Sequence, residues 1–285
     1  MELIIIFAFA AMILWGISDF FMQKTVRKIG NIQMLAYLGI IGSIVFLPFL
    51  IKDISTILNW QSMVLLVSIG LLSALHSLTA FEAFNKGKLS VVEVIIQIEL
   101  PITIVLSVIF FKELLSTYQI ILIAAILIGI IFVSTGSFKD WKSKIEQGAL
   151  LALVSGALFG IDNFLTATGS KNISPIMALA LPWIVLMIIS LIVLYKKEGF
   201  SNLVSNGIKN KWIIFWAMAT NIGGWLSYVF AVEKSYVSII SAITGSYTIV
   251  ALLLGLIINK EKIVWHQYLG AAIVLSSCIL ISLTL

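Results

Sequence analysis

Three polar side chains, Glu93, Gln97 and Glu99, interrupt an otherwise apolar stretch at residues 91–111, VVEVIIQIELPITIVLSVIFF. An acidic residue in the middle of a membrane helix costs roughly 2.5–3.5 kcal/mol on insertion scales, so it must face something polar. In the middle of a membrane helix, a carboxyl group can bind a proton or the positive group of a ligand. On a continuous helix that turns about 100° per residue, Glu93 and Gln97 share one face and Glu99 points away from Gln97. The stretch therefore predicts a site that binds charge within an apolar environment.

Other apolar stretches place aromatic rings beside acids or amides at helical spacing. Trp15 and Asp19 are one turn apart, and in TNIGGWLSYVF (220–230) Asn221, Trp225 and Tyr228 fall on one helix face. Such a stripe suits an organic solute, and a helix-packing face is the alternative. The full set of candidate residues for substrate binding or proton coupling is Trp15, Asp19, His76, Glu93, Gln97, Glu99, Asp162, Asn163, Trp183, Asn221, Trp225, Tyr228 and Tyr247.

Several of these residues also have a structural interpretation, which stays open at this point. Glu93, close to the predicted start of its helix, can reach the membrane interface, and Glu99 can be a protonated packing group bonded to a neighbour. His76 either relays protons or satisfies a hydrogen bond. Trp183 follows Pro182, whose missing N–H should kink the helix and expose a carbonyl.

The elements that must position these residues are membrane helices. The chain of 285 residues is 61% hydrophobic and only 11% charged, with a mean hydropathy of +1.13, against roughly 25% charged residues in soluble domains. Its apolar residues fall into blocks of about 20, the length that crosses a bilayer as a helix. We expect an all-α integral membrane protein with ten transmembrane helices, at about residues 3–22, 32–51, 62–84, 90–111, 117–136, 148–170, 175–195, 212–232, 236–258 and 265–285.

The net charge of +5 is explained by membrane topology. The loops between blocks 1–2, 3–4, 5–6, 7–8 and 9–10 carry 14 of the 18 lysines and arginines. By the positive-inside rule this end is cytoplasmic, which places both termini outside the cytoplasmic membrane. The basic balance therefore does not indicate nucleic-acid binding. The first block is expected to remain in the chain, because Met1 and Glu2 provide no basic segment of a signal peptide.

The two halves of the chain repeat one another. FKELLSTYQ (111–119) matches NKEKIVWHQ (259–267) at an offset of 148 residues, and WGISDFF (15–21) matches FGIDNFL (159–165) at an offset of 144. We therefore expect a single transport domain, 1–285, made of repeat one, 1–140, and repeat two, 141–285. Because a unit of five helices is odd, the second copy should enter the membrane inverted, as in many secondary transporters.

Two five-helix repeats, each with a W/F-G-x-x-x-F segment and a Lys-Glu hairpin before its last helix, resemble the EamA-type members of the drug/metabolite transporter superfamily. The resemblance implies a ten-helix basket with a central cavity lined by helices 1–4 and 6–9, helices 5 and 10 being peripheral. It also implies transport of small metabolites or lipophilic cations by exchange or proton coupling. Pro101 matches a proline common in the family's fourth helix. Ile249 and Glu93 depart from the family pattern, so no particular member's substrate follows.

These observations predict a secondary transporter that works by alternating access, with efflux as one possible direction. The absence of lysine and arginine from mid-span disfavours a phosphorylated solute, whereas acids and aromatic rings favour a cationic or zwitterionic one, such as an amine or amino acid. A lipid-modifying membrane enzyme is the first alternative, although two histidines, one cysteine and no H-E-x-x-H motif offer little catalytic chemistry. A nontransporting scaffold or channel is the second. The expected partners are the solute, lipid and protons, with no cofactor or metal, and the oligomeric state is not indicated.

Overall fold

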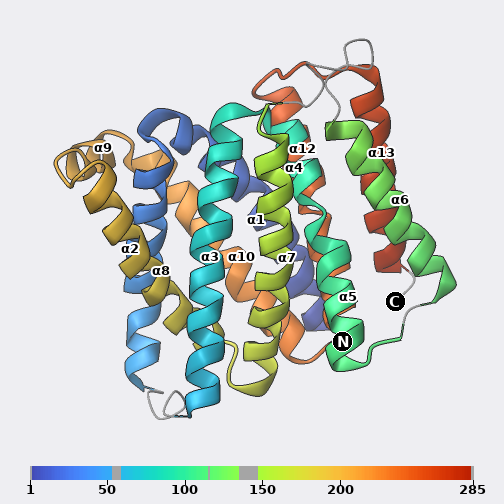
Figure 1. Ribbon diagram of the computed structural model, residues 1–285, viewed down its shortest axis with the longest axis horizontal. Coiled ribbons are helices and arrows are strands. Elements are labelled where there is room, and N and C mark those ends of the chain that lie inside the picture. The colour runs from blue at the N-terminus through green and yellow to red at the C-terminus, as the bar shows by residue number, and fades with distance from the viewer. Residues whose placement is uncertain (1, 53–58, 115, 135–146, 284–285) are drawn as a thin grey trace.

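The computed structural model describes residues 2–52, 59–114, 116–134 and 147–283, which form helices and no strand. Figure 1 shows them packed side by side along one direction. The helices are α1 (Glu2–Ile29), α2 (Asn31–Lys52), α3 (Trp60–Lys86), α4 (Leu89–Ile96), α5 (Glu99–Phe111), α6 (Thr117–Ser134), α7 (Ala149–Asn172), α8 (Met177–Lys197), α9 (Leu203–Lys209), α10 (Lys211–Glu233), α11 (Val237–Gly245), α12 (Tyr247–Ile257) and α13 (Trp265–Leu283).

Eight segments of the described chain are long and apolar enough to cross a membrane. Two of them combine successive helices, since α4 and α5 form the segment Leu89–Phe111 and α11 and α12 form Val237–Ile257. A further apolar helix, Thr117–Val133, is shorter. The all-helical membrane architecture is confirmed, and the count of ten crossings stays a prediction.

The predicted continuous helix at 90–111 is wrong, because the helix is interrupted at Gln97 and Ile98. Pro101 gives the physical reason: a proline lacks the N–H that would bond to the carbonyl four residues earlier, and its ring crowds that carbonyl. The carbonyl concerned belongs to Gln97, which instead accepts a bond from the Leu100 N–H at 3.1 Å. Glu99 therefore starts a new helix, and its direction does not follow from the face of Glu93.

The block predicted at 236–258 is interrupted as well, at Ser246. An offset of 148 residues, the one found in the sequence repeat, places Ser246 opposite Ile98 and Gly245 opposite Gln97. No proline accompanies this second interruption. An ideal Cβ on Gly245 would lie 2.5 Å from Nε2 of Gln97, so the Gln97 amide fills the space that a larger residue would need. The two interruptions therefore pack against each other.

The helices of the two halves are interleaved. α1 packs along α10 and α3 along α7, so that the first and third helices of each repeat contact the other repeat. α6 and α13 pair at one edge of the bundle, and α2 and α8 pair on the other side (Figure 1). The peripheral positions of α6 and α13 agree with those that the family resemblance implies for helices 5 and 10.

Glycines permit close packing against the two interrupted segments. An ideal Cβ on Gly160 of α7 would lie 2.7 Å from the carbonyl oxygen of Glu99, and one on Gly16 of α1 would lie 2.7 Å from that of Tyr247. The offsets of 144 and 148 residues make these two contacts equivalent. In each half, the first helix thus holds the other half's interrupted segment directly after its break.

Candidate functional site

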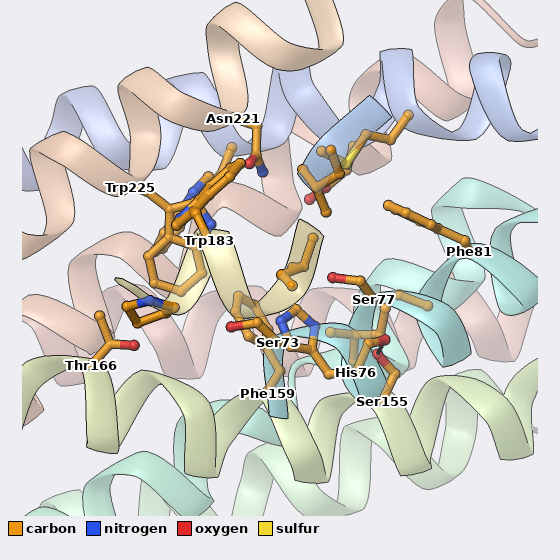
Figure 2. Close-up of a pocket in the computed structure, with 18 of the residues that line it drawn as sticks. Ser73, His76, Ser77, Phe81, Ser155, Phe159, Thr166, Trp183, Asn221 and Trp225 are labelled. Carbon is orange, nitrogen blue, oxygen red and sulfur yellow. Dashed lines mark hydrogen bonds between the residues drawn. The ribbon is translucent and has the colours of Figure 1, made fainter. Parts of the chain in front are cut away.

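A cavity lies in the middle of the bundle, between the two halves. Its lining residues come from α1, α2, α3, α4, α7, α8, α10 and α12, and none comes from α6 or α13. In Figure 2, Asn221, Trp183 and Trp225 lie on one side, opposite a group that includes Ser73, His76 and Phe159. Side chains from both repeats therefore enclose the same space.

Trp15 is the centre of an aromatic cluster that joins the two sides of the cavity. Its ring centroid lies 5.1 Å from that of Trp225, 5.3 Å from Tyr228, 6.1 Å from Tyr247 and 6.2 Å from Phe159. Trp15, Phe159, Trp225 and Tyr247 line the cavity, whereas Tyr228 is fully buried behind it. Ring faces arranged around a cavity can attract a cation and enclose an apolar group.

Three carboxyl groups gather beside the aromatic cluster. Asp19 and Glu93 line the cavity, while Glu99 is buried behind the lining residues. Glu93 lies close enough to Asp19 and Glu99, and Glu99 to Asp19, for their ionised forms to repel one another. The two oxygens of Glu93 and Oε2 of Glu99 have no hydrogen-bond partner among the described residues. Because buried carboxylates need protons or countercharges, this cluster is suited to bind one or the other.

Gln97 connects the carboxyl cluster to the second interruption. Its Oε1 accepts a hydrogen bond from the Thr248 hydroxyl, while its Nε2 has no partner among the described residues. Gln97 is fully buried and does not line the cavity. It therefore supports the place where the two interrupted segments meet.

A second polar group occupies the opposite wall. Nε2 of His76 lies 3.3 Å from Oδ2 of Asp162, which also accepts a hydrogen bond from the Ser73 hydroxyl at 2.9 Å. The His76 ring stacks on Phe159 with 4.7 Å between centroids. His76 and Ser73 line the cavity, and Asp162 is fully buried behind them. This arrangement fixes the imidazole at the cavity wall.

Trp183 is held against α2. An ideal Cβ on Gly42 would fall within the Trp183 ring, and the carbonyl of Trp183 accepts a hydrogen bond from the Ser43 hydroxyl at 2.9 Å. Asn221 and Trp225 of α10 line the same region, and Oδ1 of Asn221 has no partner among the described residues. A buried amide oxygen without a partner, on a residue that lines the cavity, can accept a hydrogen bond from a solute once the side chain turns toward it.

The structure thus divides the predicted site residues into two groups. Those that line the cavity are Trp15, Asp19, His76, Glu93, Trp183, Asn221, Trp225 and Tyr247. Those buried behind the lining are Gln97, Glu99, Asp162, Asn163 and Tyr228. The main-chain carbonyl of Asn163 accepts a hydrogen bond from the Tyr228 hydroxyl at 3.2 Å, and its side-chain Oδ1 has no partner among the described residues.

The sequence interpretation missed the hydroxyl groups of the cavity, which belong to Ser73, Ser77, Ser155 and Thr166. A signal existed for two of them. Ser73 and Ser77 lie one helical turn apart and flank His76, so they share a face with it. The described residues contain no group of three or more His, Cys, Asp or Glu side chains that could hold a metal ion.

The profile of the EamA-like transporter family matches residues 2–135 and again residues 146–283. The chain belongs to this family. Its two matches coincide with the two repeats found in the sequence, so membership in a family of membrane transporters covers nearly the whole chain. As a member of the EamA-like family, the protein is a multi-pass membrane protein related to carriers of small solutes.

Two individual proteins are similar to this family member. The uncharacterized protein MJ1333.1 of Methanocaldococcus jannaschii is 33% identical over 135 residues, which are 47% of this chain and 98% of that protein. That relative therefore has about the length of one family match. A protein of solved crystal structure is 12% identical with a TM-score of 0.67, over 98% of this chain and 96% of its own. The second likeness concerns the fold alone.

Proposed function

We propose that the protein is a secondary transporter that moves a cationic or zwitterionic organic solute across the cell membrane by alternating access. One observation carries the proposal: the carboxyl residues Asp19 and Glu93 and aromatic rings from both halves line one cavity, and no lysine or arginine is among its lining residues. Lysine and arginine also form no ion pair with Asp19, Glu93 or Glu99 in the described chain. An amine or quaternary ammonium group supplies the missing positive charge and fits the aromatic wall.

The reciprocal contacts of the two halves support an inverted repeat within a single transport domain. Gly16 and Gly160 make equivalent contacts across the repeats, and both interruptions occur at equivalent positions. In a protein built this way, exchanging the conformations of the halves converts a cavity open on one side into a cavity open on the other. The basic end faces the cytoplasm by the positive-inside rule, which places both termini outside. Activity of a C-terminal reporter that works only in the cytoplasm would contradict that orientation.

Thermal unfolding of the detergent-purified protein against amines, amino acids, sugars and phosphates tests the solute class. A ligand that binds only the folded state stabilises it by about 2.7 kcal/mol at one hundred times its dissociation constant. We expect stabilisation by amines or amino acids that is lost in Asp19→Asn and in Glu93→Gln. Glu82→Gln is the matched control, because Glu82 pairs with Lys86 near the helix end and lies outside the cavity lining.

Solute counterflow in proteoliposomes tests transport itself. A compound that stabilises the protein should exchange across the membrane with saturation, and Glu93→Gln should abolish the exchange. Stabilisation by phosphates and not by amines or amino acids would contradict the solute class. Stabilisation without counterflow would favour a scaffold, and chemical conversion of an added lipid would favour the membrane enzyme.

Proton coupling is proposed for the same carboxyl cluster. A cation that binds beside Asp19 and Glu93 favours their charged forms, so protons should leave the protein as the solute binds. Addition of the stabilising ligand to protein in a weakly buffered solution should therefore lower the pH. Asp19→Asn should reduce the proton release. Binding without any proton release would remove this coupling mechanism and leave exchange of solutes.

A further inference from the structure

Two buried or half-buried glutamates occupy equivalent positions in the Lys-Glu hairpins of the repeats. Glu113 follows Lys112, and Glu261 follows Lys260. Both lysines adopt a left-handed backbone, with φ of 56° and 54°, a conformation uncommon for residues other than glycine. The lysine before each glutamate thus has the same backbone conformation in both hairpins, so the two glutamates leave their turns in equivalent directions.

Each glutamate binds the start of an interrupted segment in the other repeat. The Leu89 N–H donates to Oε1 of Glu261 at 3.0 Å, and the Ser90 N–H and hydroxyl donate to its Oε2 at 2.9 and 2.7 Å. In the other repeat, the Val237 and Ser238 N–H groups donate to Oε1 and Oε2 of Glu113 at 2.9 and 3.1 Å. We call these two carboxylate–helix contacts the clasps. Each satisfies two N–H groups that a helix start leaves without a partner.

A basic side chain holds the same turn in each half. Arg27 of α1 donates to the carbonyls of Phe84 and Gly87, directly before α4. Lys171 of α7 donates to the carbonyl of Ser235, directly before α11. The repeat offsets make Arg27 equivalent to Lys171 and Gly87 equivalent to Ser235. The start of each interrupted segment is therefore fixed by its own repeat through a cation and by the other repeat through a carboxylate.

Not every contact between the repeats has such a counterpart. α3 packs closely along α8, where an ideal Cβ on Gly70 would lie 2.6 Å from Cβ of Val185. The equivalent pair, α10 and α2, makes only sparse contact. The two halves thus share the clasps but differ at this helix pair, which we call the α3–α8 contact.

Symmetry then separates contacts that persist from contacts that change. When two inverted repeats exchange conformations, every contact between them is replaced by its counterpart. A contact formed in both copies is therefore present before and after the exchange. A contact formed in one copy is lost at one site and gained at the other.

We propose that the Glu113 and Glu261 clasps are the fixed joints of the transport cycle, retained in both states while the α3–α8 contact opens. This proposal rests on the proposed alternating access. The clasps hold the starts of α4 and α11 and lie outside the cavity lining, so they join the two halves without touching the solute. Breaking a clasp would leave a carboxylate and two main-chain N–H groups without their partners, which makes repeated opening unfavourable.

Dipolar electron paramagnetic resonance with two pairs of spin labels on the full chain tests the proposal, in a Cys278→Ala background. Leu114→Cys with Tyr236→Cys reports on the Glu113 clasp, because both positions are exposed and adjoin it. Gln61→Cys with Ser174→Cys reports on the ends of α3 and α8. Each pair is measured in acidic and alkaline buffer, with and without benzyltrimethylammonium, an aromatic cation that fits the proposed cavity chemistry.

We expect the α3–α8 pair to shift between two distances and the clasp pair to keep one. A clasp distance that changes together with the α3–α8 distance would overturn the fixed joint and leave alternating access intact. An α3–α8 distance that stays constant under all conditions would contradict alternating access, and the joint with it. The two proposals therefore fail in distinguishable ways.

Glu113→Gln and Glu261→Gln supply a second test that separates positioning from general stability. Each variant replaces one acceptor oxygen with an N–H₂ group that faces a main-chain N–H. We expect benzyltrimethylammonium to stabilise both variants as it does the original protein, because the clasps lie outside the cavity, while counterflow is lost. Glu82→Gln should change neither. Counterflow at the original rate in both clasp variants would show that the clasps position nothing needed for transport.

Discussion

Gly223 and Gly224 are adjacent in α10 but have different surroundings, and alanine substitution at each should have opposite effects. An ideal Cβ on Gly224 would lie 2.4 Å from Cδ1 and 2.7 Å from Nε1 of Trp15. One on Gly223 would meet only the flexible Leu14 side chain, at 3.1 Å. Normal contact distances are about 3.5–4.0 Å, so Trp15 must move by about 1 Å to accept Gly224→Ala.

The magnitude follows from two opposing contributions. Replacing a helical glycine by alanine stabilises by roughly 0.5–1 kcal/mol, and this contribution is common to both variants. Overpacking in a filled core costs typically 1–3 kcal/mol, and it applies only to Gly224→Ala. The two variants should therefore differ by about 1–3 kcal/mol in the free energy of unfolding.

Thermal unfolding in one detergent, with the two variants compared side by side, measures this difference. At roughly 2–4 °C per kcal/mol for chains of 150–250 residues, Gly224→Ala should unfold several degrees below Gly223→Ala. Because Trp15 lines the cavity, Gly224→Ala should also weaken binding of an aromatic amine. Equal unfolding temperatures and equal binding for the two variants would refute the assigned contact between α1 and α10.

Three further predictions concern the acids and the interruptions. Glu113→Gln and Glu261→Gln should each lower the free energy of unfolding by about 1.5–3 kcal/mol, the contribution of a hydrogen bond to a charged group. Widely different losses of unfolding free energy in the two variants, measured by denaturation, would contradict the equivalent geometry of the two clasps. Glu93→Gln should leave stability unchanged or raised, because it removes a buried carboxyl group without partners, and a loss of several degrees would indicate an unrecognised partner. Thr248→Val should cost about 1–3 kcal/mol by leaving Oε1 of Gln97 without its donor, an effect that Gln97→Leu should remove in the double variant.

The sequence allowed the helices to be predicted because they depend on composition and helical spacing, whereas the central cavity was expected from the family resemblance. Apolar blocks mark the membrane segments. Trp15, Asp19, Asn221 and Trp225 line the cavity, whereas Tyr228, predicted on the same face as Asn221 and Trp225, lies behind it, and their roles in binding stay a prediction. The interruption at Gln97 was not predicted, although Pro101 is its physical cause. At Ser246 the Gly245-Ser246 pair is a local signal, since such pairs often mark kinks, but the sequence does not show that Gln97 packs against Gly245.

The clasps could not be predicted from the sequence either. The Lys-Glu pairs were visible as repeated hairpins, but their partners lie more than one hundred residues away in the chain. Hydrophobic periodicity carries no information on which distant N–H groups a glutamate accepts from. Only the interleaving of the repeats brings Glu113 to Val237 and Glu261 to Leu89.

Equivalent positions of the two repeats differ in how similar their residues are, depending on whether they lie at contacts between the halves or near the cavity. At the clasps and at the close glycine contacts the halves carry the same residue type, as with Glu113 and Glu261. At the cavity they differ, since Glu99 is equivalent to Tyr247 and Glu93 to Ser241. Residues that hold the halves together thus remain alike, whereas residues near the solute have diverged.

This divergence gives the cavity a direction. The carboxyl cluster of Asp19, Glu93 and Glu99 comes from repeat one, whereas Trp225 and Tyr247 come from repeat two. A solute with a cationic end should therefore bind in one orientation, with its charge beside Asp19 and Glu93. Transferring the acid, by Asp19→Asn combined with Asn163→Asp, should not restore binding, because Asp19 lines the cavity whereas Asn163 is buried outside the lining. Recovery of amine binding in that double variant would mean that net charge alone, and not the placement of the carboxyl group, selects the solute.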